Sequence, residues 1–113
     1  MLFRSAIYCK TGECEIRITA RAASDAEGEK MCREYAKKFY DLLGDAVYDE
    51  DVAGLEETLV RTLKEKGLTL STAESCTGGL IAQRITSVPG SSEVFGYGFV
   101  RSEEHTSELQ SHA

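Results

Sequence analysis

The segment from Leu68 to Val100 holds two apolar runs, separated by a polar turn and a run with helical spacing. Residues 68–73 and 94–100 predict short strands, and residues 77–87 between them predict a helix. Because a helix connecting two strands of one sheet forms a crossover, the two strands are expected to pair in parallel. Parallel sheets are normally covered on both faces, so this segment predicts the start of a larger α/β layer.

The residues before Asp45 predict a separate unit of the α+β type. Residues 13–20 alternate apolar and polar side chains, and with residues 6–10 and the turn Thr11-Gly12 they predict a β-hairpin. Ser24 and Glu27 form a capping box, so a helix is expected to follow and to end at Gly44. The apolar stripe of that helix consists of Met31, Tyr35, Phe39 and Leu42.

An acidic stretch at residues 45–51 is expected to link the two units. A second helix is expected from Asp51 onward, ending at Gly67, with two lysines in its last turn. Its apolar stripe consists of Val52, Leu55, Leu59 and Leu63.

Composition indicates an ordinary globular protein. Hydrophobic residues make up 42% and charged residues 28% of the 113 residues, which argues against wholesale disorder. The formal net charge of −6 argues against a nucleic acid or an anionic membrane as the main partner. No apolar run approaches the roughly 20 residues of a membrane span and no signal peptide follows Met1, which predicts a cytoplasmic protein.

The cysteines predict reduced thiols. Their spacing does not fit a zinc site or a disulfide framework, so no metal and no other cofactor is expected. The four cysteines are Cys9, Cys14, Cys32 and Cys76.

Residues 71–79, which read STAESCTGG, form the candidate functional site. One interpretation is a helix cap, since Ser and Thr are favoured there. Another is an anion-binding turn, in which free amides at the helix start attract a phosphate and the glycines allow close approach. A third is catalysis by Ser75, which falls at the carboxyl end of a strand where α/β sheets bind ligands. The residues alone favour the cap and leave the other two interpretations open.

Two neighbours of Ser75 have simpler explanations than catalysis. Glu74 is expected to be solvated or to interact with the helix dipole, rather than to act as a general acid. Cys76 is expected to be a small buried side chain rather than a reactive thiol.

The ordered run at residues 69–86, followed by residues 89–92 and 95–100, resembles the opening of the CinA C-terminal domain. That family comprises nicotinamide-nucleotide amidohydrolases. Residues 10–20 and 43–48 resemble the end of the KH-like middle domain of long CinA proteins, although no GxxG loop of the RNA-binding type is present. The resemblance therefore implies two part-domains, at residues 6–48 and 49–100.

The resemblance also implies a reaction, a step of pyridine nucleotide salvage. Nicotinamide mononucleotide would lose its carboxamide as ammonia and yield nicotinate mononucleotide, with Ser75 as the catalytic nucleophile. Thr77, Gly78 and Gly79 would lie beside it and bind the substrate through their amides. The partner would be this small-molecule nucleotide, and the parent protein is expected to be a homo-oligomer. The alternative is a nucleotide- or phosphate-binding module that uses the turn at residues 75–79 without catalysis.

Both ends of the chain depart from the family pattern. The family has a Tyr and a Lys soon after the second strand, and such a lysine can serve as the base for the serine, but the last lysine here is Lys66. Residues 1–5 and 101–113 instead resemble translated sequencing adapter, so both are expected to lie outside the folded part. His105 and His112 would then have no catalytic role. We therefore expect a truncated α/β chain that is inactive by itself.

Overall fold

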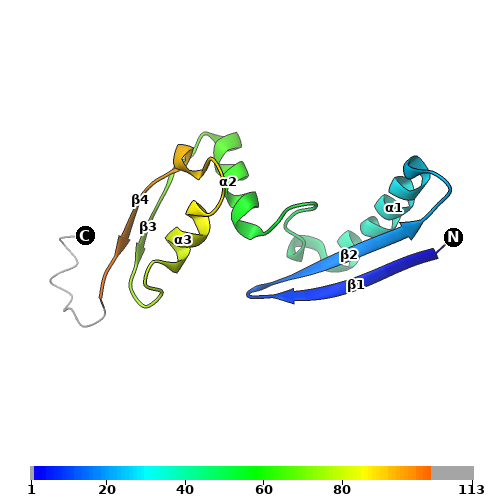
Figure 1. Cartoon of the computed structure of the whole chain (residues 1–113), viewed down its shortest axis with the longest axis horizontal. Helices are drawn as coiled ribbons and strands as arrows, with labels where there is room; N and C mark the ends of the chain where they lie inside the picture. Colours follow the sequence, from blue (N-terminus) through cyan, green and yellow to red (C-terminus); the bar gives the residue numbers. More distant parts are fainter. Residues whose placement is uncertain (1, 103–113) are drawn as a thin grey trace. The chain divides into compact units, whose positions relative to one another are not determined.

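The computed structural model describes residues 2–102, which combine helices and strands as the α/β class predicts. The chain divides into two units, Met1–Tyr48 (unit 1) and Asp49–Ala113 (unit 2). Each unit contains its own two-stranded sheet, as Figure 1 shows.

Unit 1 begins with the predicted hairpin. Strand β1, Leu2–Lys10, pairs antiparallel with β2, Glu13–Arg21, around the turn Thr11-Gly12. Gly12 has a φ of 78°, a left-handed conformation that glycine adopts without a steric penalty. The hairpin prediction is confirmed, and both strands are longer than expected.

The start of β1 corrects the expectation that residues 1–5 lie outside the folded part. Leu2 is opposite Arg21 in the sheet register, and the pairing is continuous from there to the turn. The ring of Phe3 stacks on that of Tyr35, with 4.9 Å between their centroids. Backbone pairing and an aromatic contact therefore place residues 2–5 in the fold.

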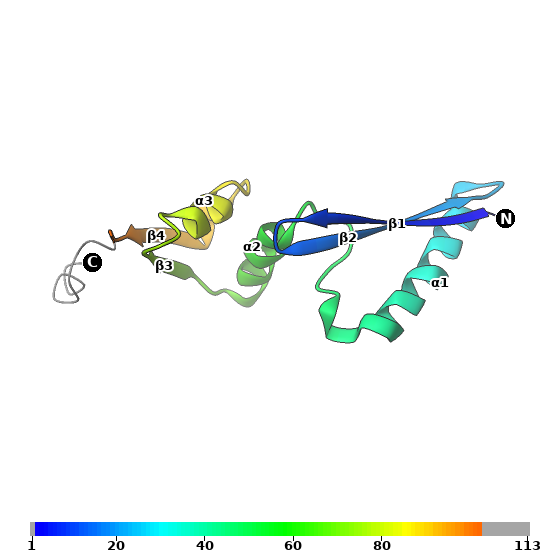
Figure 2. The same cartoon turned by 90° about the horizontal axis from the view of Figure 1, so that it is seen from below.

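Helix α1, Asp25–Leu43, has the predicted ends. The Ser24 hydroxyl accepts a hydrogen bond from the Glu27 amide, and the amide of Gly44 donates to the carbonyl of Tyr40. Figure 2 shows the helix beside the hairpin, and the Cys32 thiol contacts the Ile18 carbonyl of β2. The predicted apolar stripe is correct for Met31, which is buried, and for the half-buried Tyr35 and Phe39. It is wrong for Leu42, which is 80% exposed in the last turn of the helix.

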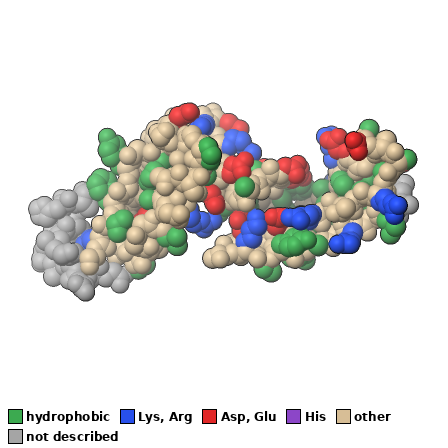
Figure 3. Space-filling view, in the orientation of Figure 1, with side chains coloured by type: hydrophobic (Ala, Val, Ile, Leu, Met, Phe, Trp, Pro, Cys, Tyr) green, Lys and Arg blue, Asp and Glu red, His purple; other side chains and the backbone are tan. Residues whose placement is uncertain are grey.

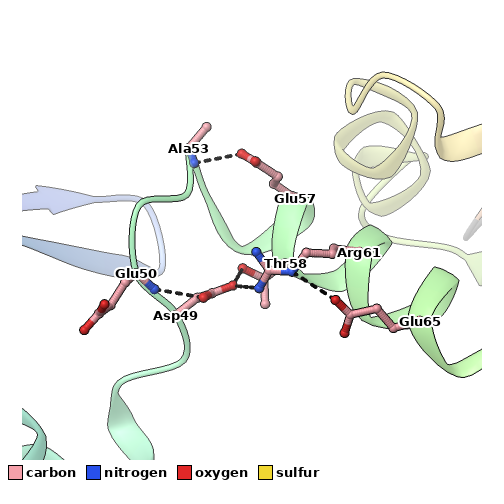
Figure 4. A network of polar contacts seen from close by, with 7 residues as sticks. All are labelled: Asp49, Glu50, Ala53, Glu57, Thr58, Arg61 and Glu65. Atoms are coloured by element: carbon pink, nitrogen blue, oxygen red, sulfur yellow. Dashed lines mark hydrogen bonds and ion pairs between the residues drawn. The ribbon is translucent and has the colours of Figure 1, made fainter.

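Unit 2 starts with a polar network rather than a plain linker (Figure 4). The Asp49 carboxylate accepts hydrogen bonds from the Thr58 hydroxyl at 2.8 Å and from the Glu50 amide at 2.9 Å. It also pairs with the guanidinium of Arg61. The hydrogen bond from Thr58 is the largest effect that lowers the pKa of Asp49 below its ordinary value. The network joins the acidic stretch to helix α2, Leu55–Lys66.

Helix α2 begins later than predicted because the residues before Leu55 are not helical. Asp51 has a left-handed φ of 53°, and Gly54 is extended. The predicted end is confirmed: Gly67 is left-handed, and the Leu68 amide donates to the Leu63 carbonyl.

The second sheet of the chain confirms the predicted parallel pair. Strand β3, Leu70–Glu74, pairs in parallel with β4, Phe95–Val100, and helix α3, Leu80–Thr86, lies between them in sequence. A short 3-10 turn, Ser91–Glu93, leads into β4. The core of unit 2 is formed by α2, α3 and the start of β4, through Val60, Ile85, Val94 and Phe95.

Large apolar side chains remain at the surface of both units, as Figure 3 shows. In β4, Tyr97 is 71% exposed, and Phe99 and Val100 are also exposed. The described residues of unit 2 therefore bury only part of the apolar surface of this sheet. Within residues 2–102, every helix is too short or too polar to cross a membrane.

We predict that Phe3→Ala lowers the free energy of unfolding by about 1–2 kcal/mol, because it removes the stacking contact with Tyr35. Urea denaturation followed by far-UV circular dichroism measures this change. The matched control is Leu2→Ala, since Leu2 is 67% exposed and its removal should change stability by less than about 0.5 kcal/mol. Equal effects of the two substitutions would contradict a folded start of β1.

Candidate functional site

The turn at residues 75–79 joins the carboxyl end of β3 to the start of α3. Gly78 and Gly79 have φ values of 63° and 98°, which other residues rarely adopt. The Gly78 amide donates to the Ser75 carbonyl at 3.1 Å, and the Leu80 amide donates to the Thr77 carbonyl at 3.2 Å. These contacts fold the segment into a tight turn at the edge where ligands bind α/β sheets.

Glu74, the last residue of β3, holds this turn in place. Its side chain is buried, at 5% exposure. One carboxylate oxygen accepts hydrogen bonds from the Thr77 hydroxyl and the Ile81 amide, both at 2.7 Å, and the other accepts from the Ala82 amide at 3.0 Å. Glu74 therefore caps α3, whose N-cap residue, Gly79, makes no side-chain cap of its own.

This cap refines the sequence-based interpretation. The sequence pattern predicts a capping role for the Ser and Thr hydroxyls of the turn, but the Thr77 hydroxyl donates to Glu74 instead. Of the two roles expected for Glu74, interaction with the helix dipole is correct and solvation is wrong. The sequence indicates this role of Glu74, because a carboxylate near the start of a helix stabilises the helix.

The ionisation of Glu74 follows from the same contacts. Burial raises the pKa of the carboxyl group, but the hydrogen bonds from Thr77, Ala82 and Ile81 outweigh burial and leave the pKa below its ordinary value. Glu74 is therefore ionised at neutral pH. An ionised carboxylate that accepts from two amides cannot act as a general acid.

Ser75 is exposed immediately beyond this anchor. Within residues 2–102, its hydroxyl makes no hydrogen bond, and the amides of Thr77 and Gly79 are also without a partner. The Gly78 amide, one of the three predicted donors, is engaged by the Ser75 carbonyl. The turn thus presents an exposed hydroxyl and two amides that have no hydrogen-bond partner among the described residues. Cys76 is exposed too, which corrects the expectation that it is buried.

Gly79 has a further structural role. A Cβ atom at this position would lie 3.1 Å from the Cγ2 atom of Val100, at the end of β4. The turn therefore packs against the carboxyl end of the second strand, and the backbone of Gly79 reaches it only because no side chain intervenes.

The lysines of unit 2 lie at the other end of this sheet. The ammonium of Lys64 pairs with Glu93, just before β4 begins, and Lys66 is the last residue of α2. His105 and His112, for which no catalytic role was expected, lie outside the described residues. Among residues 2–102, no cluster of His, Cys, Asp or Glu has the arrangement of a metal site.

We predict that Glu74→Ala lowers the Tm by about 5 °C, because two amides and the Thr77 hydroxyl lose their acceptor. Thermal unfolding followed by circular dichroism measures the shift. Glu93→Ala is the matched control, since Glu93 is 69% exposed and should change the Tm little. A Tm unchanged in Glu74→Ala would show that the cap does not stabilise unit 2.

The stabilisation by Glu74 should depend on pH in one direction. Because its pKa is lower in the folded state, the stabilisation is fully present above the unfolded pKa and is lost as pH falls through the folded pKa. Urea midpoints of the wild type and of Glu74→Gln, which cannot titrate, should therefore differ most above about pH 5 and converge as the pH falls below the ordinary pKa of a glutamate. A constant difference over this range would contradict an ionised cap.

The sequence matches two family models. Residues 52–108 match the CinA C-terminal domain, and residues 4–48 match the damage-inducible protein CinA KH domain.

Curated relatives and a solved structure resemble the chain as well. A CinA-like protein of Dictyoglomus turgidum is 54% identical over 88 residues, covering 78% of this chain and 21% of the relative. A putative competence-damage inducible protein of Caldicellulosiruptor saccharolyticus is 44% identical, over 84% of this chain and 23% of the relative. The crystal structure of competence/damage inducible protein CihA from Agrobacterium tumefaciens is 38% identical with a TM-score of 0.46, over 58% of this chain and 38% of that chain.

The chain spans about a fifth of the length of the curated relatives it matches. Since one family model covers half of its residues and a second covers most of the remainder, the chain belongs to the CinA family.

Proposed function

We propose that this chain carries the nucleophile-bearing part of a nicotinamide-nucleotide amidohydrolase site. The observation that carries the proposal is the exposed Ser75, placed at the carboxyl end of a parallel strand by the buried Glu74 carboxylate. Membership of the CinA family supports it, because the turn lies within the part that matches the CinA C-terminal domain.

In this mechanism the Ser75 oxygen attacks the carboxamide carbon of nicotinamide mononucleotide. The carbonyl oxygen becomes an oxyanion, which the free amides of Thr77 and Gly79 are suited to stabilise. Ammonia then leaves with a proton, and the serine ester that remains is hydrolysed by water to nicotinate mononucleotide.

The mechanism also needs a base for the serine proton. In the described part of unit 2, both lysines lie toward the amino ends of the strands, away from Ser75. Arg101 follows β4 directly, but a guanidinium stays protonated and is unsuited to this role. We therefore expect no ammonia release by this chain alone, and expect turnover when the rest of a CinA C-terminal domain supplies the base.

The non-catalytic alternative has weaker support. The Glu74 carboxylate already accepts hydrogen bonds from the amides of Ile81 and Ala82, so a phosphate at this turn would have only the amides of Thr77 and Gly79 to bind. The negative charge of Glu74 would also repel a phosphate there. The carboxamide that binds in the proposed reaction is neutral, and only the oxyanion formed from it meets this repulsion.

A chimera tests the proposal. Residues 52–100 replace the matching segment of the Dictyoglomus turgidum relative, and ammonia release from nicotinamide mononucleotide is measured for the chimera and for the unaltered relative. We expect turnover by both, and a loss of about a thousandfold or more in the chimera with Ser75→Ala, because the nucleophile is removed.

Ser71→Ala is the matched control, since it removes another exposed hydroxyl, from β3. Made in the chimera, this substitution should leave the rate of ammonia release within a few fold of that of the unsubstituted chimera. Activity that survives Ser75→Ala would overturn the assigned nucleophile. If neither the chimera nor the relative released ammonia, and both bound the nucleotide, the non-catalytic alternative would be supported instead.

A further inference from the structure

The hairpin of unit 1 carries a pair of cysteines that the proposed hydrolysis does not use. Cys9 in β1 and Cys14 in β2 are directly opposite one another in the sheet register. Both are exposed, and all four cysteines of the chain are free. Two thiols at one solvent-exposed position of a sheet are open to oxidants.

The position of the pair in the hairpin suits a covalent bond. Lys10 and Glu13 flank the two-residue turn and close it, so the next pair, Cys9 and Cys14, is a non-hydrogen-bonded pair. The Cα atoms of such pairs are about 4.5 Å apart, which lies within the range of about 4.4–6.8 Å that disulfides span. A bond between these sulfurs therefore needs little movement of the backbone.

The two thiols are close enough to influence one another's ionisation. A hydrogen bond with the Cys9 thiol is the largest effect that raises the pKa of Cys14 above its ordinary value. Because directly opposite residues of an antiparallel pair point to the same face, the two sulfurs lie on the same side of the sheet. Because the thiolate is the attacking species, bond formation is expected to become faster as the pH rises.

We propose that Cys9 and Cys14 form a redox-active pair that oxidised glutathione converts to an intramolecular disulfide. The thiolate of one cysteine attacks the glutathione disulfide, forms a mixed disulfide and releases one glutathione thiolate. The second cysteine then attacks the protein sulfur of that mixed disulfide and releases the second glutathione. Two protein thiols lose two electrons and two protons, and one glutathione disulfide is reduced to two glutathione molecules.

The remaining cysteines provide an internal comparison. Cys32 is half-buried in α1 and its thiol contacts the Ile18 carbonyl, while Cys76 is exposed in unit 2. Neither has a cysteine opposite it in a sheet. Cys76 is expected to stop at the mixed disulfide, whereas the hairpin pair proceeds to the bridge. This inference does not depend on the proposed amide hydrolysis.

The test equilibrates the chain with about 1 mM reduced and oxidised glutathione, alkylates the remaining thiols and digests with trypsin. Cleavage after Lys10 separates the two cysteines, so a bridged pair of peptides identifies the bond. We expect the bridged form to exceed the form with glutathione on both cysteines by roughly tenfold or more, because the opposite thiol acts at a high effective concentration. Treatment with a reductant should restore both thiols.

The matched control combines Cys14→Ser with Thr19→Cys, which moves the second thiol to an exposed position on the other face of β2. Circular dichroism should show an unchanged fold, and both cysteines should carry glutathione without a bridge. Glutathione on both Cys9 and Cys14 in the wild type, or an equal bridged fraction in the control, would overturn the proposal.

Discussion

The buried carboxylate of Glu74 determines the geometry of the candidate site. It accepts hydrogen bonds from the Thr77 hydroxyl and from the amides of Ile81 and Ala82, so one side chain joins the end of β3 to the first turn of α3. The segment between these contacts has to close into a tight turn with Ser75 at its exposed start. The position of Ser75 follows from a cap that engages only backbone and hydroxyl groups, and these hydrogen bonds compensate for burying the charge.

Two glycines also shape the packing around this turn. Gly79 approaches the side chain of Val100 so closely that a Cβ atom would crowd it. Gly98, in the middle of β4, lies under Ala82 and the ring of Phe95, where a Cβ atom would come within about 3.2 Å of both. A side chain at either position would therefore require Val100, Ala82 or Phe95 to shift by a few tenths of an ångström.

The two units differ in how they are held together. Unit 2 has a small continuous core around Val60 and Ile85. In unit 1, by contrast, Met31 is the one buried apolar side chain among the described residues, and the ring of Phe3 stacks on that of Tyr35. Such thin cores make single contacts important, which is why a short segment at the start of β1 can matter for stability.

The sequence by itself determined the features that depend on neighbouring residues. The alternation of apolar and polar residues predicted the hairpin, and the capping box predicted the start of α1. Glycines predicted where the helices α1 and α2 end. Only the tertiary structure decided contacts between residues that are distant along the chain. The stacking of Phe3 on Tyr35, the exposure of Leu42 and the approach of Glu74 to Ala82 depend on how elements pack, which no local pattern specifies. Hence the sequence located the turn around Ser75, and the packing of β3, α3 and β4 decided which of its groups are free to act.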